Sequence, residues 1–282
     1  LEFRRVLFRS AMTELERACR ARRDVGRKAL VPYLTAGFPD EATTLELLAG
    51  CADRGCEVVE VGVPFSDPVA DGPVIQRASQ HALERGMTLR RALHLVRELA
   101  DRRVRPVVMT YLNPILRLGY AGFAAEAART GCAGVIVPDL SYEESGPLRT
   151  ALTDAGVALV DLVAPTTFDG RLDMIAGPAR GFLYLVSVAG VTGTCSATAD
   201  ALAAFTARVR DRTDVPLYVG FGIDGPDRAR EAAAVADGVI VGSALVRRLL
   251  DAPDPAAGAA AALALVDELV AALAGTPRRT LT

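Results

Sequence analysis

Tryptophan is missing from this sequence of 282 residues, and aromatic residues of all kinds make up only 5% of it. Lysine occurs once, at Lys28, and histidine twice, at His81 and His94. The formal net charge is only −2, and charges of both signs are interspersed. Without a clustered positive face, nucleic acid is excluded as the main partner. A chain that is 51% hydrophobic but poor in aromatics instead predicts a large core of aliphatic side chains.

Close cysteine spacings are also missing. The five cysteines are scattered, with no CxxC pair, which predicts a reduced, cytoplasmic protein. No apolar run is expected to reach the ~20 residues that span a bilayer. The first ten residues, LEFRRVLFRS, lack the apolar core and cleavage site of a signal peptide. We interpret residues 1–11 as a non-native leader and residues 12–282 as a single barrel domain.

From Lys28 onward, eight short apolar runs alternate with longer segments of helical period. Continuously apolar strands are typical of a parallel sheet covered on both faces. Eight such units in roughly 250 residues favour a closed (β/α)₈ TIM barrel over an open doubly wound sheet. The predicted strands are 29–34, 58–63, 106–111, 134–137, 157–163, 181–186, 216–219 and 238–241. The predicted helical segments are 41–54, 88–102, 123–130, 143–155, 199–211, 227–236 and 256–274.

Glu60 interrupts the second apolar run, VVEVGV. With a period of two, it shares a strand face with Val58 and Gly62. Burial raises the pKa of a carboxyl group there unless the group is paired. Its place near the carboxyl end of the strand favours catalysis, because barrel active sites lie at that end. The alternative is a structural ion pair with an arginine of the helical layer.

The loop after this strand, PFSDPVADGP at 64–73, contains Asp67 and Asp71 between three prolines. Prolines stiffen a loop, and a stiff acidic loop beside a buried Glu suits general acid–base catalysis. Asp71 is equally compatible with a cap for a helix that begins at Pro73. The loop taken alone does not decide between these two roles.

Glycine-rich turns follow the last three predicted strands: GVTG at 190–193, GFGI at 220–223 and GSA at 242–244. Glycine allows backbone N–H groups to approach an anion, and a helix starting at Ser243 adds the partial positive charge of its N-terminus. Loops after the seventh and eighth strands, with a short extra helix, form the usual phosphate site of this barrel. Together the three turns predict a phosphate-binding site, although each alone is compatible with a simple turn.

The scarcity of lysine and histidine limits the chemistry. A Schiff-base lyase needs a lysine at the carboxyl end of a strand, whereas Lys28 precedes the first one. His81 and His94 lie in helical segments with polar neighbours, which predicts surface positions rather than zinc ligands or partners of a nucleophilic serine. No metal site is expected. What remains is acid–base catalysis by carboxylates on a phosphorylated substrate that carries its own electron sink.

Six motifs resemble those of the tryptophan synthase alpha subunit, in that family's order and spacing, and the likeness extends from Met12 to the end of the chain. The stretch PFSDPVADGP is the most specific of them, whereas the glycine motifs also occur in other phosphate-binding barrels. The motifs are VEVGVPFSDPVADGPVIQ (59–76), MTYLNPI (109–115), VIVPDLSYEES (135–145), YLVSVAGVTG (184–193), VGFGI (219–223) and VIVGSALV (239–246).

The resemblance implies a lyase of tryptophan biosynthesis, which cleaves indole-3-glycerol phosphate to indole and glyceraldehyde 3-phosphate. Glu60 would protonate indole C3 and accept the hydroxyl proton, Asp71 would hydrogen-bond the indole N–H, and Tyr184 would assist. The phosphate would bind at Gly193, Gly222, Gly242 and Ser243. The indole pocket would consist of Tyr33, Ile75, Met109, Ile136, Thr192 and Phe221.

The resemblance also implies a beta-subunit partner in an α₂β₂ assembly. That partner would carry pyridoxal phosphate, and this chain would hold no cofactor. Asp67 would contact the beta subunit, while Asn113 and Asp139 would order the neighbouring loops. One departure from the family concerns the segment after GVTG, which reads TCSATAD where many relatives have an arginine that helps the loop close. How tightly segment 188–198 closes, and how strongly it is coupled to a beta subunit, is therefore left open.

Three alternatives remain. A stand-alone lyase would release free indole without a partner. Another phosphate-binding barrel, such as a sugar-phosphate isomerase, would release no indole from indole-3-glycerol phosphate. A non-catalytic scaffold would activate the beta subunit through loop 64–73, but the presence of Glu60, Asp71 and Tyr184 disfavours it.

Overall fold

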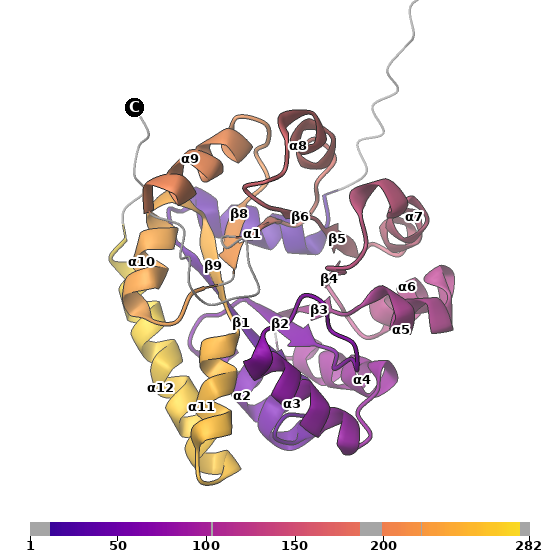
Figure 1. Ribbon diagram of the computed structural model, residues 1–282, viewed down its shortest axis with the longest axis vertical. Helices are drawn as coiled ribbons and strands as arrows, with labels where there is room; N and C mark the ends of the chain where they lie inside the picture. Colours follow the sequence, from indigo (N-terminus) through magenta and orange to yellow (C-terminus); the bar gives the residue numbers. More distant parts are fainter. Residues whose placement is uncertain (1–11, 103, 187–198, 221, 277–282) are drawn as a thin grey trace, which may run out of the picture.

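The computed structural model describes residues 12–102, 104–186, 199–220 and 222–276. Strands and helices alternate through most of this part of the chain, with the helices arranged around the strands (Figure 1). The strands are β1 (Ala29–Thr35), β2 (Val58–Gly62), β3 (Arg105–Met109), β4 (Gly134–Ile136), β5 (Ala158–Val160), β6 (Leu162–Val163), β7 (Leu183–Val186), β8 (Leu217–Gly220) and β9 (Gly238–Val241). The helices are α1 (Glu14–Asp24), α2 (Glu41–Asp53), α3 (Pro73–Glu84), α4 (Leu89–Ala100), α5 (Leu112–Leu118), α6 (Tyr120–Arg129), the 3₁₀ helix η1 (Tyr142–Glu144), α7 (Gly146–Asp154), α8 (Asp169–Ala176), α9 (Ala199–Arg210), α10 (Pro226–Val235), α11 (Ser243–Asp251) and α12 (Pro255–Ala274).

All of these strands pair in parallel in one sheet, in the order β5-β4-β3-β2-β1-β9-β8-β7-β6. The two strands at the ends of this order, β5 and β6, are consecutive in the chain and separated only by Asp161. The N–H of Tyr184 donates to the carbonyl of Asp161 at 3.0 Å, so the two ends of the sheet are joined. The predicted (β/α)₈ barrel is confirmed, and the predicted strand 157–163 changes its partner from β4 to β7 at Asp161.

Some helices are present that the sequence pattern did not indicate. Helix α5 is one of them. Its first turn is held by a carboxylate from another loop, since Asp139 accepts from the N–H of Leu112 at 2.9 and 3.2 Å. Such a contact cannot be seen in the local pattern. Helix α8 has only 8 residues and no side-chain cap. Helix α1, by contrast, has a readable signal, since Thr13 caps it and Leu15 is fully buried.

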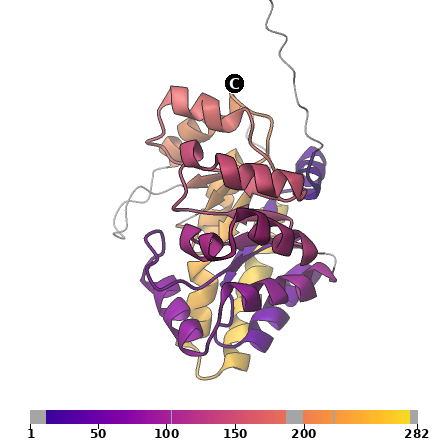
Figure 2. The same cartoon turned by 90° about the vertical axis from the view of Figure 1, so that its right-hand side faces the viewer.

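Helix α1 closes the end of the barrel from which the strands begin. Figure 2 shows it in indigo at one side of the molecule. Leu15 fits into the space left by two glycines, because a Cβ at Gly134 or Gly181 would lie 2.7 or 2.8 Å from its side chain. The opposite end, where the strands finish, is therefore the end from which a substrate can enter.

Helix α12 corrects one expectation. By length and composition it could cross a membrane, with 20 residues and a mean hydropathy of 1.8, although no run of that kind was expected. Its alanine-rich sequence raises the hydropathy without large side chains. The helix packs against α2, α10 and α11, and core helices of soluble proteins pass the same test. The finding is thus weak evidence for a membrane span.

Candidate active site

A cavity of about 250 Å³ opens at the carboxyl ends of the strands. The side chains that line it come from β1, β2, β3, β7 and β9 and from the loops that follow β2, β8 and β9. It brings together residues that are far apart in the sequence and that the motifs had singled out. The lining residues are Tyr33, Glu60, Ala70, Asp71, Gly72, Pro73, Val74, Ile75, Met109, Tyr184, Gly222, Ile223, Ile240, Gly242, Ser243 and Arg247.

Glu60 is the most unusual group in this cavity. It is 1% exposed, and neither of its carboxyl oxygens has a hydrogen-bond partner among the described residues. Burial raises the pKa of Glu60 to about 8, and the charge of nearby Asp71 adds to the effect. The alternative of an ion pair with an arginine of the helical layer is wrong for the described part of the chain. A carboxyl group with such a pKa exchanges protons near neutral pH, as a general acid–base catalyst must.

Asp71 lies beside Glu60 in the loop ahead of α3. Burial raises the pKa of Asp71 to about 6, while the interaction with Tyr111 acts in the opposite direction. Helix α3 does begin at Pro73, but its N-cap residue is Gly72 and no side chain caps it. The alternative role of Asp71 as a helix cap is therefore wrong. Two adjacent carboxyl groups with separated pKa values can divide the roles of acid and anion.

Two tyrosine rings flank the acidic pair, and each occupies space left by a glycine. A Cβ added to Gly62 would lie 2.1 Å from the hydroxyl oxygen of Tyr33, and one added to Gly220 would lie 2.2 Å from that of Tyr184. Burial raises the pKa of both tyrosines well above the ordinary value, and the charges of Glu60 and Asp71 contribute. Both hydroxyl groups therefore remain protonated and able to donate a hydrogen bond.

The other end of the cavity has the features of an anion site. Gly222 adopts a φ of 75°, a left-handed conformation that favours glycine. Gly242 is the N-cap residue of α11, which starts at Ser243, so the positive end of a nine-residue helix faces the cavity. Arg247, one turn further along α11, also lines it.

Not every predicted pocket residue can be placed in the cavity. Tyr33, Ile75 and Met109 line it, whereas Ile136 is fully buried and is not part of the lining. Ile136 pairs with Met109 in the sheet register, so it packs in the barrel interior beside that residue. Three further predicted residues, Thr192, Gly193 and Phe221, lie outside the described residues.

The lysine and the histidines lie away from this cavity. Lys28 immediately precedes β1, and its ammonium group donates to the carbonyl of Ala236, just ahead of β9. It is therefore at the closed end of the barrel, as expected. His94 is exposed, as predicted. His81 is half-buried instead: its ring packs edge-on against Phe38, and Nε2 lies 3.1 Å from the carbonyl of Pro39. No group of histidine, cysteine and carboxylate side chains that could hold a metal ion exists among the described residues.

The residues expected at a partner surface lie on loops at the same end of the barrel. Asp67 and Asn113 are exposed, and Asp139 holds the first turn of α5, on which Asn113 lies. Three large apolar side chains of these loops and helices are also exposed, namely Val69 at 74%, Leu116 at 49% and Phe168 at 68%. These side chains are available for contact with another protein at this end of the barrel.

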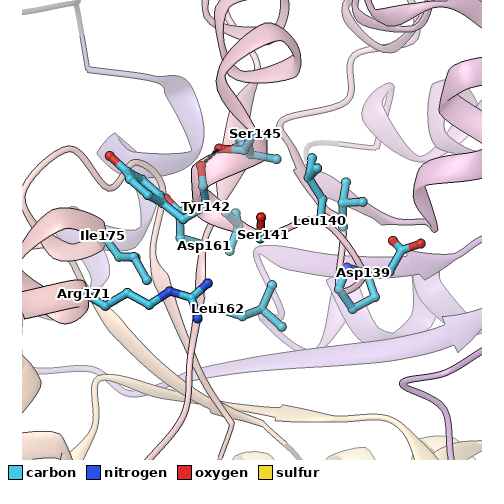
Figure 3. A pocket seen from close by; sticks show the side chains of 13 residues that line it. Asp139, Leu140, Ser141, Tyr142, Ser145, Asp161, Leu162, Arg171 and Ile175 are labelled. Atoms are coloured by element: carbon cyan, nitrogen blue, oxygen red, sulfur yellow. Dashed lines mark hydrogen bonds between the residues drawn. The ribbon is translucent and has the colours of Figure 1, made fainter. Parts of the chain in front are cut away.

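A second cavity, of about 350 Å³, is lined by the segment that follows β4, by β5 and the start of β6, and by α8 (Figure 3). Its charged groups already have partners within the protein. Arg171 pairs with Glu143 at 3.0 Å, and Asp161 pairs with Arg149 at 2.5 Å. Asp161 and Arg171 are thus held in ion pairs, unlike the carboxyl group of Glu60 in the first cavity, which is unpaired among the described residues, although the second cavity is the larger of the two.

Two residues of the first cavity's surroundings were not predicted. Tyr111 lies in the motif MTYLNPI, and its hydroxyl oxygen accepts a hydrogen bond from the N–H of Ala70, next to Asp71, at 3.1 Å. An aromatic hydroxyl at the end of an apolar strand is the signal that could have identified it. Arg247 follows Ser243 by four residues, and residues with this spacing lie on one face of a helix. The sequence could therefore have identified Arg247, because it lies one turn after the helix N-terminus that was predicted to bind phosphate.

Comparison with known proteins agrees with this geometry. The family model described as tryptophan synthase alpha chain matches residues 20–274. A tryptophan synthase alpha chain from Phenylobacterium zucineum is 47% identical over 231 residues, which is 81% of this chain and 83% of the relative. One from Chloroflexus aurantiacus is 46% identical over 256 residues, 89% of this chain and 95% of the relative. The crystal structure of the alpha subunit from Legionella pneumophila superposes with a TM-score of 0.85 at 34% identity and covers 94% of this chain and 99% of that one. This chain belongs to the tryptophan synthase alpha chain family, and it is a lyase-type enzyme.

Proposed function

We propose that this protein cleaves indole-3-glycerol phosphate to indole and glyceraldehyde 3-phosphate, with Glu60 as the acid–base catalyst. The observation that carries the proposal is the buried carboxyl group of Glu60, which lacks a partner among the described residues and has a pKa raised to about 8. Such a group is largely protonated at neutral pH and can deliver its proton to carbon. General acid–base catalysis of this kind contributes roughly 10²–10⁴-fold to a rate.

The reaction needs two proton transfers, one from Glu60 to the substrate and one from the substrate back to Glu60. Glu60 donates its proton to indole C3, which turns the enamine of the ring into an iminium ion. The bond from C3 to the side chain then breaks, and its electron pair returns to the ring to neutralise the iminium. The side-chain hydroxyl becomes the aldehyde and gives its proton to the Glu60 carboxylate, so the catalyst is regenerated.

The remaining residues stabilise this sequence. Asp71, ionised above a pKa of about 6, would accept a hydrogen bond from the indole N–H and stabilise the cationic ring. Tyr184, with a hydroxyl that stays protonated, would donate a hydrogen bond and position the side-chain oxygen. Tyr33, Ile75 and Met109 supply the apolar lining that a flat aromatic ring prefers.

The phosphate group would bind at Gly222, Gly242 and Ser243, together with the predicted Gly193. The helix N-terminus at Ser243 and the left-handed backbone at Gly222 support this placement. Arg247 would add a full positive charge at the same end of the cavity. Anchoring the phosphate would hold the indole ring near Glu60, because Glu60, Gly222, Gly242 and Ser243 line the same cavity.

A beta subunit is the proposed partner, in an α₂β₂ assembly that works in the cytoplasm, with pyridoxal phosphate on the beta subunit. Exposed Val69, Leu116 and Phe168 support a protein partner at the open end of the barrel. The acidic loop 64–73 reaches from this surface to Asp71, so a bound partner could alter the active site directly.

The test is to mix the purified protein with indole-3-glycerol phosphate and follow indole, with and without a beta subunit of a relative. The proposal predicts indole release that increases when the beta subunit is added. Release that is already maximal without a partner would favour the stand-alone lyase. No release under either condition would contradict the proposed reaction and favour another phosphate-binding barrel, or the scaffold if the protein still activated the beta subunit.

A further inference from the structure

Tyr111 connects the acidic loop 64–73 to the start of α5. Its side chain is 3% exposed. The hydroxyl oxygen accepts a hydrogen bond from the N–H of Ala70 at 3.1 Å, and its interaction with the neighbouring Asp71 lowers the pKa of that carboxyl group. The ring stacks on Phe65, with ring centroids 5.1 Å apart and planes inclined by 26°. One side chain thus contacts the loop near its beginning and near its end.

The interaction with Asp71 has an electrostatic consequence. Burial favours the neutral form of Asp71, whereas the interaction with Tyr111 lowers the pKa and favours the carboxylate. The other titratable or charged groups that share this cavity are Glu60 on β2, Tyr33 on β1, Tyr184 on β7 and Arg247 on α11. Among the groups found to shift the pKa of Asp71, Tyr111 is the one that favours the charged form.

The backbone of Tyr111 is itself held in place. Tyr111 is the N-cap residue of α5, but its side chain makes no cap hydrogen bond and is directed to the loop instead. The carboxylate of Asp139 accepts from the next backbone N–H, that of Leu112, at 2.9 and 3.2 Å. Asp139 therefore takes over the capping role, and the tyrosine hydroxyl remains available for Ala70 and Asp71.

We propose that Tyr111 is a positioning residue: its hydroxyl, bonded to the N–H of Ala70, and its ring, stacked on Phe65, hold the loop so that the carboxylate of Asp71 takes the geometry that the indole N–H requires. The proposal rests on the function proposed above, in which Asp71 stabilises the cationic ring. Without the hydroxyl, the N–H of Ala70 loses its acceptor, and Asp71 loses an interaction that favours its charged form. A larger share of Asp71 is then protonated at neutral pH, and the carboxylate that remains is held less firmly.

The test is Tyr111→Phe, which keeps the ring and its stacking on Phe65 and removes only the hydroxyl. Tyr120→Phe is the matched control, since Tyr120 is a half-buried tyrosine on α6 outside the cavity. For Tyr111→Phe we expect kcat for indole release to fall about tenfold at neutral pH, with KM changed less than about twofold. The acid limb of the pH–rate profile should move upward by about half a pH unit or more. The control should leave kcat, KM and the acid limb unchanged.

A second readout does not depend on activity. The pKa of Asp71, followed by carboxyl NMR and assigned with Asp71→Asn, should rise in Tyr111→Phe and stay constant in Tyr120→Phe. A higher pKa in a protein whose wild type releases no indole would support the positioning of Asp71 and reject the proposed reaction. An unchanged pKa together with an unchanged acid limb would overturn the proposal for Tyr111. A raised KM with both unchanged would also overturn it, because Tyr111 would then bind substrate directly.

Discussion

The two cavities at the open end of the barrel differ in how their charged groups are satisfied. In the smaller cavity, Glu60 is buried with no partner among the described residues, and its pKa is raised to about 8. In the larger one, Asp161 and Arg171 are each paired with an oppositely charged side chain. Pairing with Arg149 lowers the pKa of Asp161 and so opposes the rise that burial causes, whereas Glu60 has no counter-charge of this kind in the described part of the chain. The unpaired carboxyl group of Glu60, rather than the volume of the cavity, therefore distinguishes the candidate active site.

The largest effect on kcat is expected when Glu60 can no longer transfer a proton. Glu60→Gln keeps the size of the side chain but cannot donate and recover a proton. We expect kcat for indole release to fall at least 10³-fold, at the upper end of the roughly 10²–10⁴-fold range for general acid–base catalysis. Steady-state kinetics with indole-3-glycerol phosphate measures it. A fall in kcat of less than about tenfold would contradict the role of Glu60 and would leave nothing to distinguish the smaller cavity as the active site.

A smaller effect is expected at the phosphate end. Arg247 follows Ser243 by one turn, and side chains lean toward the N-terminus of their helix. Arg247→Gln should raise KM for indole-3-glycerol phosphate about five- to tenfold with little change in kcat, since the charge-assisted contact is present in the substrate and transition-state complexes alike. Arg248→Gln, on the same helix and with the same charge change, is the control, because Arg248 does not line the cavity. Equal effects of the two substitutions would mean that only net charge matters.

Stability should depend on pH through Glu60. Its pKa in the folded protein is raised, so the folded state holds a proton that the unfolded chain releases. This contribution is complete below the ordinary carboxyl pKa and is lost as pH rises through about 8. Between about pH 5 and about pH 8, the free energy of unfolding of the wild type should fall by up to about 1.4 kcal/mol per pH unit relative to Glu60→Gln. Urea unfolding of both proteins across this range measures the difference, and parallel curves would contradict a raised pKa.

The smallest effect belongs to the second cavity. Arg171→Met removes a half-exposed ion pair with Glu143, whose side chains are 35% and 49% exposed. Exposed pairs of this kind contribute about 1 kcal/mol or less, so stability should change little and kcat and KM should stay within about twofold. A strong loss of indole release in this variant, with its melting temperature unchanged, would show that the second cavity takes part in the reaction.

The sequence was sufficient for the barrel and for most of the site. Apolar runs marked the strands because parallel strands are covered on both faces, and Glu60 stood out because a charge in such a run is rare. The pairing state of Glu60 could not be predicted, since it depends on whether an arginine from a distant helix reaches it. The hydrogen bond from Ala70 to Tyr111 likewise joins a loop to a strand end 41 positions later. Ile136 is a further case: its strand end was predicted correctly, and sheet register pairs it with Met109 while its side chain is fully buried and does not line the cavity.

The central claim is that Glu60 keeps its proton at neutral pH. A carboxyl NMR titration of the wild type, with the Glu60 signal assigned by its absence in Glu60→Gln, measures this directly. The structure predicts a midpoint of about 8 for that signal. A midpoint of about 4.3, the value of an unperturbed glutamate in model peptides, would show that Glu60 is ionised at neutral pH and would contradict the proposed proton transfer.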